Sequence, residues 1–173
     1  MTFAFVRPTA DDVERLAALK SETFIDTFGA DNDPDELAAH VERKFSIPAV
    51  AAQLVDPDCE TTWVLDQTEP VGYLKLNHRR AQTEPGLEQG LEIEQLYVRR
   101  SHHGKGLGGQ LLDLAARTAR RDGYAFLWLS VWERNGNAIA LYRHRGYRVF
   151  DEHVFMLGAE AQTDLLMRLD LQT

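Results

Sequence analysis

A glycine-rich run at residues 103–109 is the part of this chain whose residue types point most clearly to ligand binding. The run reads His-Gly-Lys-Gly-Leu-Gly-Gly and lies between an apolar segment, Leu91 to Val98, and a segment with helical periodicity. Glycine has no Cβ, so a ligand can approach the backbone closely. The first amides of a helix lack backbone partners and lie at the positive end of the helix dipole. The run therefore predicts a site for an anion, most simply a ligand that carries phosphate.

Basic side chains gather beside this run against an acidic background. The chain has 173 residues and a formal net charge of −8, yet five basic residues lie close together here: Arg99, Arg100, His102, His103 and Lys105. A local positive patch suits an anionic ligand, and a solvated run of charges is the alternative. The overall acidity argues against a nucleic-acid partner, which normally meets a basic surface, and favours a cationic one.

Asn135 and Tyr142 form a second pair whose spacing could build a site. Seven residues make about two helical turns, or about 10 Å, so both side chains would lie on one helix face. The small Ala138 lies between them on that face. The face could line a groove with Asn135 at its mouth and the Tyr142 hydroxyl deeper inside. The alternative is a capping asparagine followed by a tyrosine of the core.

Two carboxylates, Glu92 and Glu94, interrupt an otherwise apolar strand pattern from Leu91 to Val98. Residues two apart on a strand share a face, so both carboxylates would lie on the same side. That side would be the wall of a cleft, or the solvated face of an edge strand.

The elements that must position these residues follow from hydrophobic periodicity and turn signals. We expect strands at residues 3–7, 61–66, 71–77, 91–98, 125–132, 147–151 and 164–169. We expect helices after Thr9, after Asp33, and at residues 48–54, 105–121 and 137–145. This order predicts an α/β (α+β) fold in which helices flank one mixed sheet, in a single domain over residues 1–173.

The glycine run also satisfies the pattern G-x-G-x-x-G through Gly104, Gly106 and Gly109, with Glu133 downstream as a possible ribose-binding acid. A dinucleotide-binding fold would place this loop directly after its first strand. Here only one strand–helix unit follows the run, so the context disfavours that interpretation.

The three features together resemble the GCN5-related N-acetyltransferase (GNAT) family. The family signature, Gln or Arg followed by x-x-Gly-x-Gly/Ala, corresponds to residues 103–108, with His103 in place of Gln or Arg. The family's Asn-x-x-Ala-x-x-x-Tyr helix corresponds to Asn135, Ala138 and Tyr142. Within the family the chain is most similar to the bacterial Pai-type spermine/spermidine acetyltransferases, on strings at residues 26–29, 72–77, 81–84 and 162–165.

The resemblance implies a mixed, mostly antiparallel sheet with two splayed strands, and acetyl-CoA as co-substrate. It implies transfer of the acetyl group to a primary amine, a polyamine or similar small molecule, by direct attack in a ternary complex. A protein N-terminus or an antibiotic is the alternative acceptor, and a non-catalytic acyl-CoA-binding sensor is the alternative function.

The same resemblance assigns roles to residues of this chain. Those expected to bind acetyl-CoA are Leu96, Tyr97, Val98, His103, Gly104, Lys105, Gly106, Gly108, Gly109 and Asn135. Leu96 would also offer a freed backbone N–H to the oxyanion. Because an amine arrives mostly protonated, a base is needed, and we expect Glu94, or else Glu92, to serve. Tyr142 would protonate the leaving thiolate.

Further expectations concern the surroundings of the protein. Cys59 is the only cysteine, which excludes an intrachain disulfide and favours a reducing cytoplasm. No apolar stretch reaches the roughly 18 residues of a membrane-spanning helix, so we expect no membrane partner. The six histidines show no spacing typical of metal ligands, so we expect no metal site. A homodimer is possible.

Overall fold

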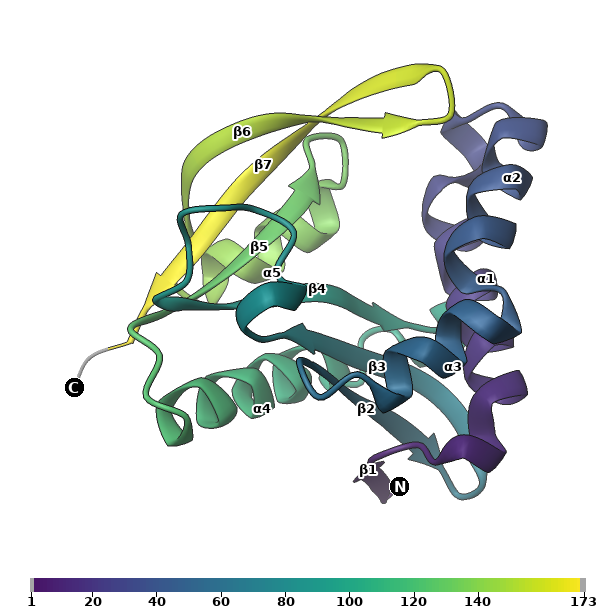
Figure 1. Cartoon of the computed structure of the whole chain (residues 1–173), viewed down its shortest axis with the longest axis horizontal. Coiled ribbons are helices and arrows are strands. Elements are labelled where there is room, and N and C mark those ends of the chain that lie inside the picture. Colours follow the sequence, from purple (N-terminus) through teal and green to yellow (C-terminus); the bar gives the residue numbers. More distant parts are fainter. Residues whose placement is uncertain (1, 172–173) are drawn as a thin grey trace.

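One sheet organises the whole molecule in the computed structural model, which describes residues 2–171 (Figure 1). Its strands are β1 (Phe3–Val6), β2 (Cys59–Asp66), β3 (Glu69–Asn77), β4 (Gly90–Val98), β5 (Phe126–Trp132), β6 (Arg148–Leu157) and β7 (Glu160–Asp170). They lie in the order β1-β2-β3-β4-β5-β7-β6. Neighbouring strands are antiparallel except β4 and β5, which are parallel. The expected mixed, mostly antiparallel sheet is confirmed.

Helices cover both faces of this sheet. They are α1 (Val13–Phe28), α2 (Pro34–Phe45), α3 (Ile47–Val55), α4 (Leu107–Arg121) and α5 (Gly136–His144). On one face, Trp63 and Tyr73 pack against α1 and α3. On the other, Val64 and Leu74 pack in the cluster that contains the apolar side of α4. Because adjacent strand residues point to opposite faces, the sheet lies between the two helical layers.

The sheet splits between β4 and β5. The two strands pair from Gly90 with Phe126 to Ile93 with Leu129, and no pairing is present beyond Ile93 within the described residues. Figure 1 shows the two ribbons diverging there. The pairing of β4 with β3 also shifts, since Lys75 opposes Gln95 while Leu76 opposes Ile93. Glu94 is thus the extra residue of a β-bulge, a device that bends a strand and re-aims its side chains. The splayed strands that the resemblance implied are therefore present.

The structure corrects several expected boundaries. The last two strands form one long hairpin, β6 to Leu157 and β7 from Glu160, where the sequence predicted two shorter strands. The hairpin projects from the sheet, so its side chains need not alternate between apolar and polar residues as those of a half-buried strand do. Val154, for example, is 66% exposed. Helix α4 begins at Leu107 rather than Lys105, because Gly106 has a φ of +77°, a left-handed conformation that ends the loop and caps the helix.

None of the helices within residues 2–171 combines the length and the apolar character that crossing a membrane would require.

Candidate active site

A cleft of about 1310 Å³ opens where β4 and β5 part. The glycine loop, the free end of β4, the end of β5, helix α5 and strand β6 all contribute to its walls. Helices α1 and α2 close it from the other side through Phe24, Phe28 and Lys44. The split of the sheet therefore creates one continuous space that reaches from the glycine loop to the β6–β7 hairpin.

The glycine loop has the conformation expected of an anion-binding helix start. Gly104 and Gly106 have φ angles of +76° and +77°, which L side chains rarely adopt. The first backbone hydrogen bond of α4 runs from the Gln110 amide to the Gly106 carbonyl, so the amides before it have no acceptor within the helix. A Cβ at Gly108 would lie 3.1 Å from Leu141 of α5, so this glycine also lets the two helices pack closely.

The remaining residues of the run differ in where they face. Gly109 lines the cleft, and a Cβ there would collide with the Arg145 guanidinium. Lys105 is exposed and does not line the cleft. His103 lines it, and its Nε2 donates to the Val98 carbonyl at 2.7 Å. The Nδ1 atom of neutral His103 then carries no proton, so only the imidazolium form offers an N–H to an anion.

The positive cluster expected beside the run is largely paired within the protein. Arg99 forms an ion pair with Glu22 at 2.9 Å, and the His102 ring lies 3.0 Å from an oxygen of Asp66. Because these side chains already have partners, the backbone amides of the glycine loop, rather than the basic side chains, are the main groups that could bind an anion.

Helix α5 fits both interpretations of its two polar residues. Asn135 caps the helix, since its side-chain oxygen accepts from the Ala138 amide at 3.3 Å. Tyr142 lines the cleft although its residue is only 8% exposed. Burial raises the pKa of Tyr142 to about 12, so its hydroxyl keeps its proton at neutral pH. A protonated hydroxyl on the wall of a cleft is suited to donate to a ligand.

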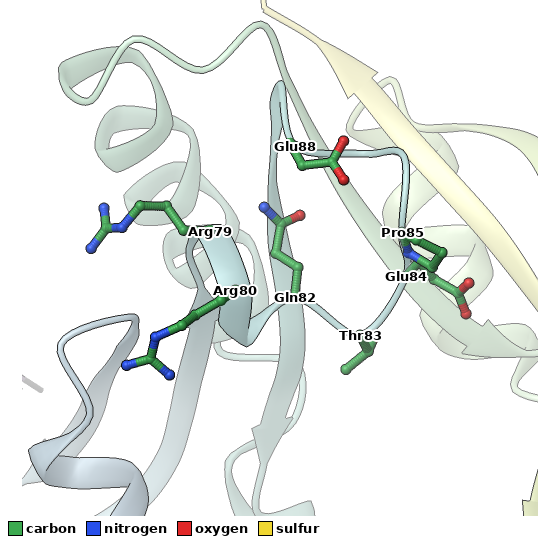
Figure 2. A pocket seen from close by; sticks show the side chains of 7 residues that line it. All are labelled: Arg79, Arg80, Gln82, Thr83, Glu84, Pro85 and Glu88. Atoms are coloured by element: carbon green, nitrogen blue, oxygen red, sulfur yellow. The ribbon is translucent and has the colours of Figure 1, made fainter.

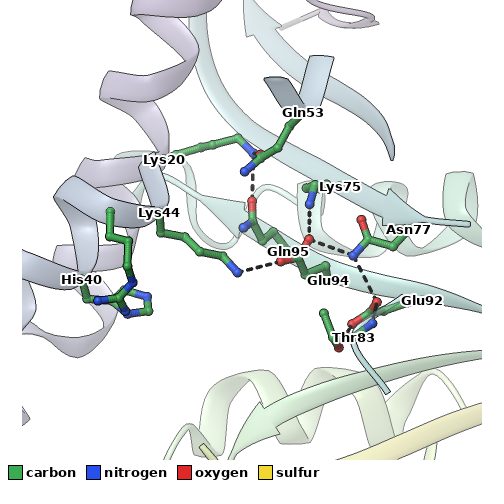
Figure 3. A network of polar contacts seen from close by, with 11 residues as sticks. Lys20, His40, Lys44, Gln53, Lys75, Asn77, Thr83, Glu92, Glu94 and Gln95 are labelled. Atoms are coloured by element: carbon green, nitrogen blue, oxygen red, sulfur yellow. Dashed lines mark hydrogen bonds and ion pairs between the residues drawn. The ribbon is translucent and has the colours of Figure 1, made fainter. Parts of the chain in front are cut away.

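Glu94 is held by cations from two elements. Lys75 of β3 forms an ion pair and hydrogen bond with it, Lys44 of α2 lies at 3.1 Å, and Asn77 donates at 2.9 Å (Figure 3). Burial would raise the pKa of Glu94, but the two lysine charges and the hydrogen bonds outweigh it and lower the pKa from 4.5 to about 2. Such a carboxylate binds a proton weakly at neutral pH. Its role as a base stays a prediction, and its contacts suit a fixed negative charge.

Glu92 lies deeper than Glu94, with only 2% of the residue exposed. Asn77 donates to it at 3.1 Å, and the Thr83 amide donates at 2.9 Å. Burial outweighs these bonds and raises the pKa of Glu92. Both carboxylates reach the same Asn77 amide, as expected for one face of the strand. The alternative of a solvated edge strand is wrong, because β4 lies in the middle of the sheet.

A buried lysine continues this polar network behind β4 (Figure 3). Lys20 of α1 is fully buried and donates to Gln95 at 2.9 Å and to Gln53 at 3.1 Å. Its ammonium lies over the Tyr73 ring, 4.9 Å from the centroid. Burial, followed by the charge of Lys75, lowers the pKa of Lys20 to about 7. The network fixes the bulged part of β4 against α1.

The rest of the β4 segment also lines the cleft, and its binding of acetyl-CoA stays a prediction. Leu96, Tyr97 and Val98 all lie along the cleft, beyond the last β5 pairing. The Tyr97 ring stacks on Tyr73 with centroids 5.8 Å apart. Burial, and then the neighbouring Tyr142 and Asp164, raise the pKa of Tyr97.

Sequence reasoning missed a polar cluster on the hairpin side of the cleft. His153 of β6 contacts Glu84 through Nδ1 and lies 3.2 Å from the Ser130 hydroxyl of β5 through Nε2. Ser130 donates to Asp164 of β7 at 2.8 Å. All four residues line the cleft. They come from distant parts of the chain, and only Glu84 and Asp164 belong to the family-like strings of the sequence.

A second pocket, of about 550 Å³, borders the segment that leads into β4 (Figure 2). It shares Thr83 and Glu84 with the main cleft. Its two arginines are already paired, Arg79 with Asp58 and Arg80 with Asp58 at 3.1 Å. The pocket is therefore a weak candidate for binding an anion.

One group of potential metal ligands appears that sequence spacing did not reveal. Ligand atoms of Glu60, His78 and Asp122 lie within 4.8 Å of one another. Two cations compete for the same carboxylates, since Arg7 contacts Glu60 at 2.7 Å and Arg121 contacts Asp122 at 2.7 Å. The absence of a metal from this protein stays a prediction.

Comparison with known proteins agrees with this architecture. The model of the acetyltransferase (GNAT) family matches residues 15–147. An uncharacterised N-acetyltransferase from Lactobacillus delbrueckii subsp. lactis is 39% identical over 163 residues, 94% of each chain. A split mixed sheet beside a glycine loop and a helix start is thus the framework of an acetyltransferase. The chain belongs to the GNAT family, whose enzymes use acetyl-CoA as acetyl donor.

Two solved structures add to this comparison. The PaiA N-acetyltransferase of Thermoplasma acidophilum, solved in complex with coenzyme A, superposes with a TM-score of 0.83 at 18% identity, covering 98% of this chain and 99% of that one. Nourseothricin acetyltransferase superposes with a TM-score of 0.59 at 27% identity over 68% of each chain. The first shows a shared fold, and neither identifies the acceptor of this chain.

Proposed function

We propose that this enzyme transfers the acetyl group of acetyl-CoA to a primary amine of a small cationic molecule, with polyamines the first class to test. Transfer would be direct, within a ternary complex. The observation that carries the proposal is the single cleft, which joins the glycine loop, the Tyr142 hydroxyl and a set of carboxylates.

The donor end of the cleft has the features that a pyrophosphate requires. The unpaired amides at the start of α4 and the left-handed turns at Gly104 and Gly106 would hold it. The pantetheine arm would lie along Leu96, Tyr97 and Val98, where β4 has no β5 partner. His103, Lys105 and Asn135 remain proposed contacts. Asn135 keeps its amide N–H groups for a ligand, because only its oxygen serves the helix cap.

The cleft as a whole has more carboxylates than lysines and arginines in its lining. Carboxylates that line the cleft are Asp26, Asp31, Glu84, Glu92, Glu94 and Asp164. They outnumber the lysines and arginines of the lining, Lys44, Arg100 and Arg134. A cleft lined by one sign of charge concentrates ligands of the opposite sign. A molecule with two or more ammonium groups fits this surface better than a neutral acceptor does.

The proposed chemistry uses few groups of the protein. Holding the thioester and the amine together in the cleft supplies a large part of the acceleration. A freed backbone N–H of β4, with Leu96 the predicted donor, would stabilise the oxyanion. Tyr142 would give its proton to the sulfur as the C–S bond breaks.

The test is an amine panel with acetyl-CoA, read by release of the free thiol and by the mass of the product. The panel contains putrescine, spermidine, spermine, a monoamine of similar length and a peptide with a free N-terminus. We expect the polyamines to have the highest kcat/KM. A preference for the monoamine or the peptide would contradict the proposed acceptor class. Acetyl-CoA binding without transfer to any acceptor would instead favour a sensor.

An antibiotic acceptor is the second candidate. It is favoured by the 27% identity with nourseothricin acetyltransferase over 68% of each chain. Adding nourseothricin to the panel separates the two, since a kcat/KM for the antibiotic above that of every polyamine would reverse the order of the candidates.

Cytoplasmic location and a homodimer also stay predictions. Sedimentation at several protein concentrations tests the oligomeric state directly.

A further inference from the structure

A histidine on the hairpin side of the cleft has the surroundings of a general base. His153 of β6 is bracketed by Glu84, from the segment before β4, and by Ser130 of β5 and Asp164 of β7. Its Nε2 lies 3.2 Å from the Ser130 hydroxyl and 3.8 Å from an oxygen of Asp164. These three groups come from three separate segments of the chain, and they converge on one imidazole.

The hydrogen bonds determine which nitrogen of His153 carries the proton. An ionised carboxylate only accepts, so the contact with Glu84 requires N–H at Nδ1. The single hydroxyl proton of Ser130 goes to Asp164 at 2.8 Å, so it is not available to Nε2. In neutral His153, Nε2 therefore keeps its lone pair. Once protonated, Nε2–H can donate to the Ser130 oxygen.

The imidazole is accessible from the space where the chemistry is proposed to occur. The His153 side chain is 28% exposed and lines the same cleft as Tyr142. Tyr97 lines the same cleft, and burial, followed by the neighbouring Tyr142 and Asp164, raises its pKa. In addition, Oδ1 of Asp164 is buried and has no hydrogen-bond partner among the described residues.

The two carboxylates of β4 are less suited to accept a proton. The pKa of Glu94 is about 2, since Lys75 and Lys44 hold its charge. Glu92 already accepts hydrogen bonds from Asn77 and Thr83. Histidine, in contrast, is the residue type that changes charge near neutral pH. A base with a carboxylate partner that fixes its tautomer is a recurring arrangement in transfer enzymes.

We propose that His153 is the general base of the transfer, with Glu84 as its positioning residue. The inference rests on the proposed acetylation of an amine. The amine lone pair attacks the thioester carbon, the C–N bond forms, and the C–S bond breaks. The proton of the nitrogen passes to Nε2 of His153, directly or through one water, while Tyr142 gives its proton to the sulfur. His153 then releases a proton to solvent and Tyr142 takes one back.

Charged groups of the same sign face His153 from two neighbouring segments. They are the carboxylates of Glu84 and Asp164, and Glu133 acts on Asp164 in turn. Removing the Glu84 charge removes the constraint that places the proton on Nδ1.

The experiment compares wild type, His153→Gln, His153→Ala and Glu84→Gln, with His144→Gln as control because His144 is exposed and lies outside the cleft. The acceptor is the amine of the panel with the highest turnover. We expect His153→Gln to lower kcat at least 100-fold and to remove the acidic limb of the pH profile, with the Kd for acetyl-CoA within twofold of wild type. Imidazole should partly restore His153→Ala, and Glu84→Gln should lose about tenfold, as expected for a positioning group.

The outcomes separate this inference from the function on which it rests. If the kcat of His153→Gln stays within threefold of wild type, or if the acidic limb of its pH profile is unchanged, the inference is overturned. The proposed function is untouched by that result. A wild-type enzyme that acetylates no amine overturns the proposed function and this inference with it. Circular dichroism and the Tm of each variant identify loss of fold. If His153→Gln unfolds, the imidazole response of His153→Ala decides, and its absence in a folded protein refutes the base.

Discussion

Replacing Glu94 by glutamine tests whether this carboxylate serves as a fixed charge. The side chain is 11% exposed and neutralises Lys75, whose side chain is 5% exposed. Glutamine keeps the shape and one oxygen but removes the charge, so Lys75 stays buried beside Lys44 without an anion. Removing one partner of a buried pair is strongly destabilising, because it leaves an uncompensated charge.

The pKa of Glu94 gives the size of the effect. A fall from 4.5 to about 2 corresponds to about 3 kcal/mol, at about 1.4 kcal/mol for each tenfold change in proton affinity. Since the folded-state pKa lies below the unfolded one, this stability is fully present above pH 4.5. It is lost as the pH falls towards 2. We therefore expect Glu94→Gln to lower the free energy of unfolding by about 3 kcal/mol at pH 7, with a difference from wild type that shrinks below pH 4.5.

Urea unfolding at a series of pH values, followed by circular dichroism, measures both the loss and its pH dependence. Glu42→Gln is the matched control, because Glu42 is an exposed carboxylate of α2 and should change stability by less than about 0.5 kcal/mol. A Glu94→Gln loss as small as that of the control would refute the reasoning. So would a loss that stays constant down to pH 2.

Three further substitutions test other parts of the site. Tyr142→Phe should lower kcat about 100-fold with little change in acetyl-CoA affinity, while Tyr147→Phe, which removes a buried hydroxyl outside the cleft, should leave kcat unchanged; equal effects in steady-state assays would remove Tyr142 from the acid role. His103→Arg should tighten coenzyme A binding about tenfold by calorimetry, because arginine is always charged and offers several donors; unchanged affinity would show that the loop amides suffice. Lys20→Met should stabilise the fold near pH 7, where burial opposes the ammonium, and the gain should shrink by up to about 1.4 kcal/mol per pH unit between 7 and 10.5; thermal unfolding at several pH values measures it, and a gain that rises with pH would contradict this account.

The sequence allowed prediction of those parts of the site that depend on local chain geometry. The glycine run ahead of α4 and the cap at Asn135 follow from residue type and spacing over a few positions, whereas α4 starts two residues later than expected because Gly106 adopts a left-handed conformation. The parallel pair β4 and β5 follows from the helix between them. Glu92 and Glu94 share a face because side chains two residues apart on a strand point to the same side, and this periodicity is also local.

The contacts that decide the behaviour of these side chains are not local. Lys44, Lys75 and Glu94 come from three elements, and their distances depend on how α2 packs over the sheet. No periodicity in the sequence signals that a lysine of α2 will reach a carboxylate of β4. The sequence therefore predicted that Glu94 would line a cleft, but not that its charge would be held so firmly.

The bulge explains why the same carboxylate could suggest two roles. Without the extra residue at position 94, β4 would keep its register with β3. Its side chains would then go on alternating between the two faces of the sheet beyond that position. The bulge brings Glu94 to Lys75, while Gln95 reaches Lys20, so the strand is fixed from behind by two lysines. A strand fixed in this way can end its pairing with β5 and still hold its backbone groups at the cleft. Proton transfer then falls to groups across the gap, among them His153, whose neighbours leave a nitrogen lone pair free.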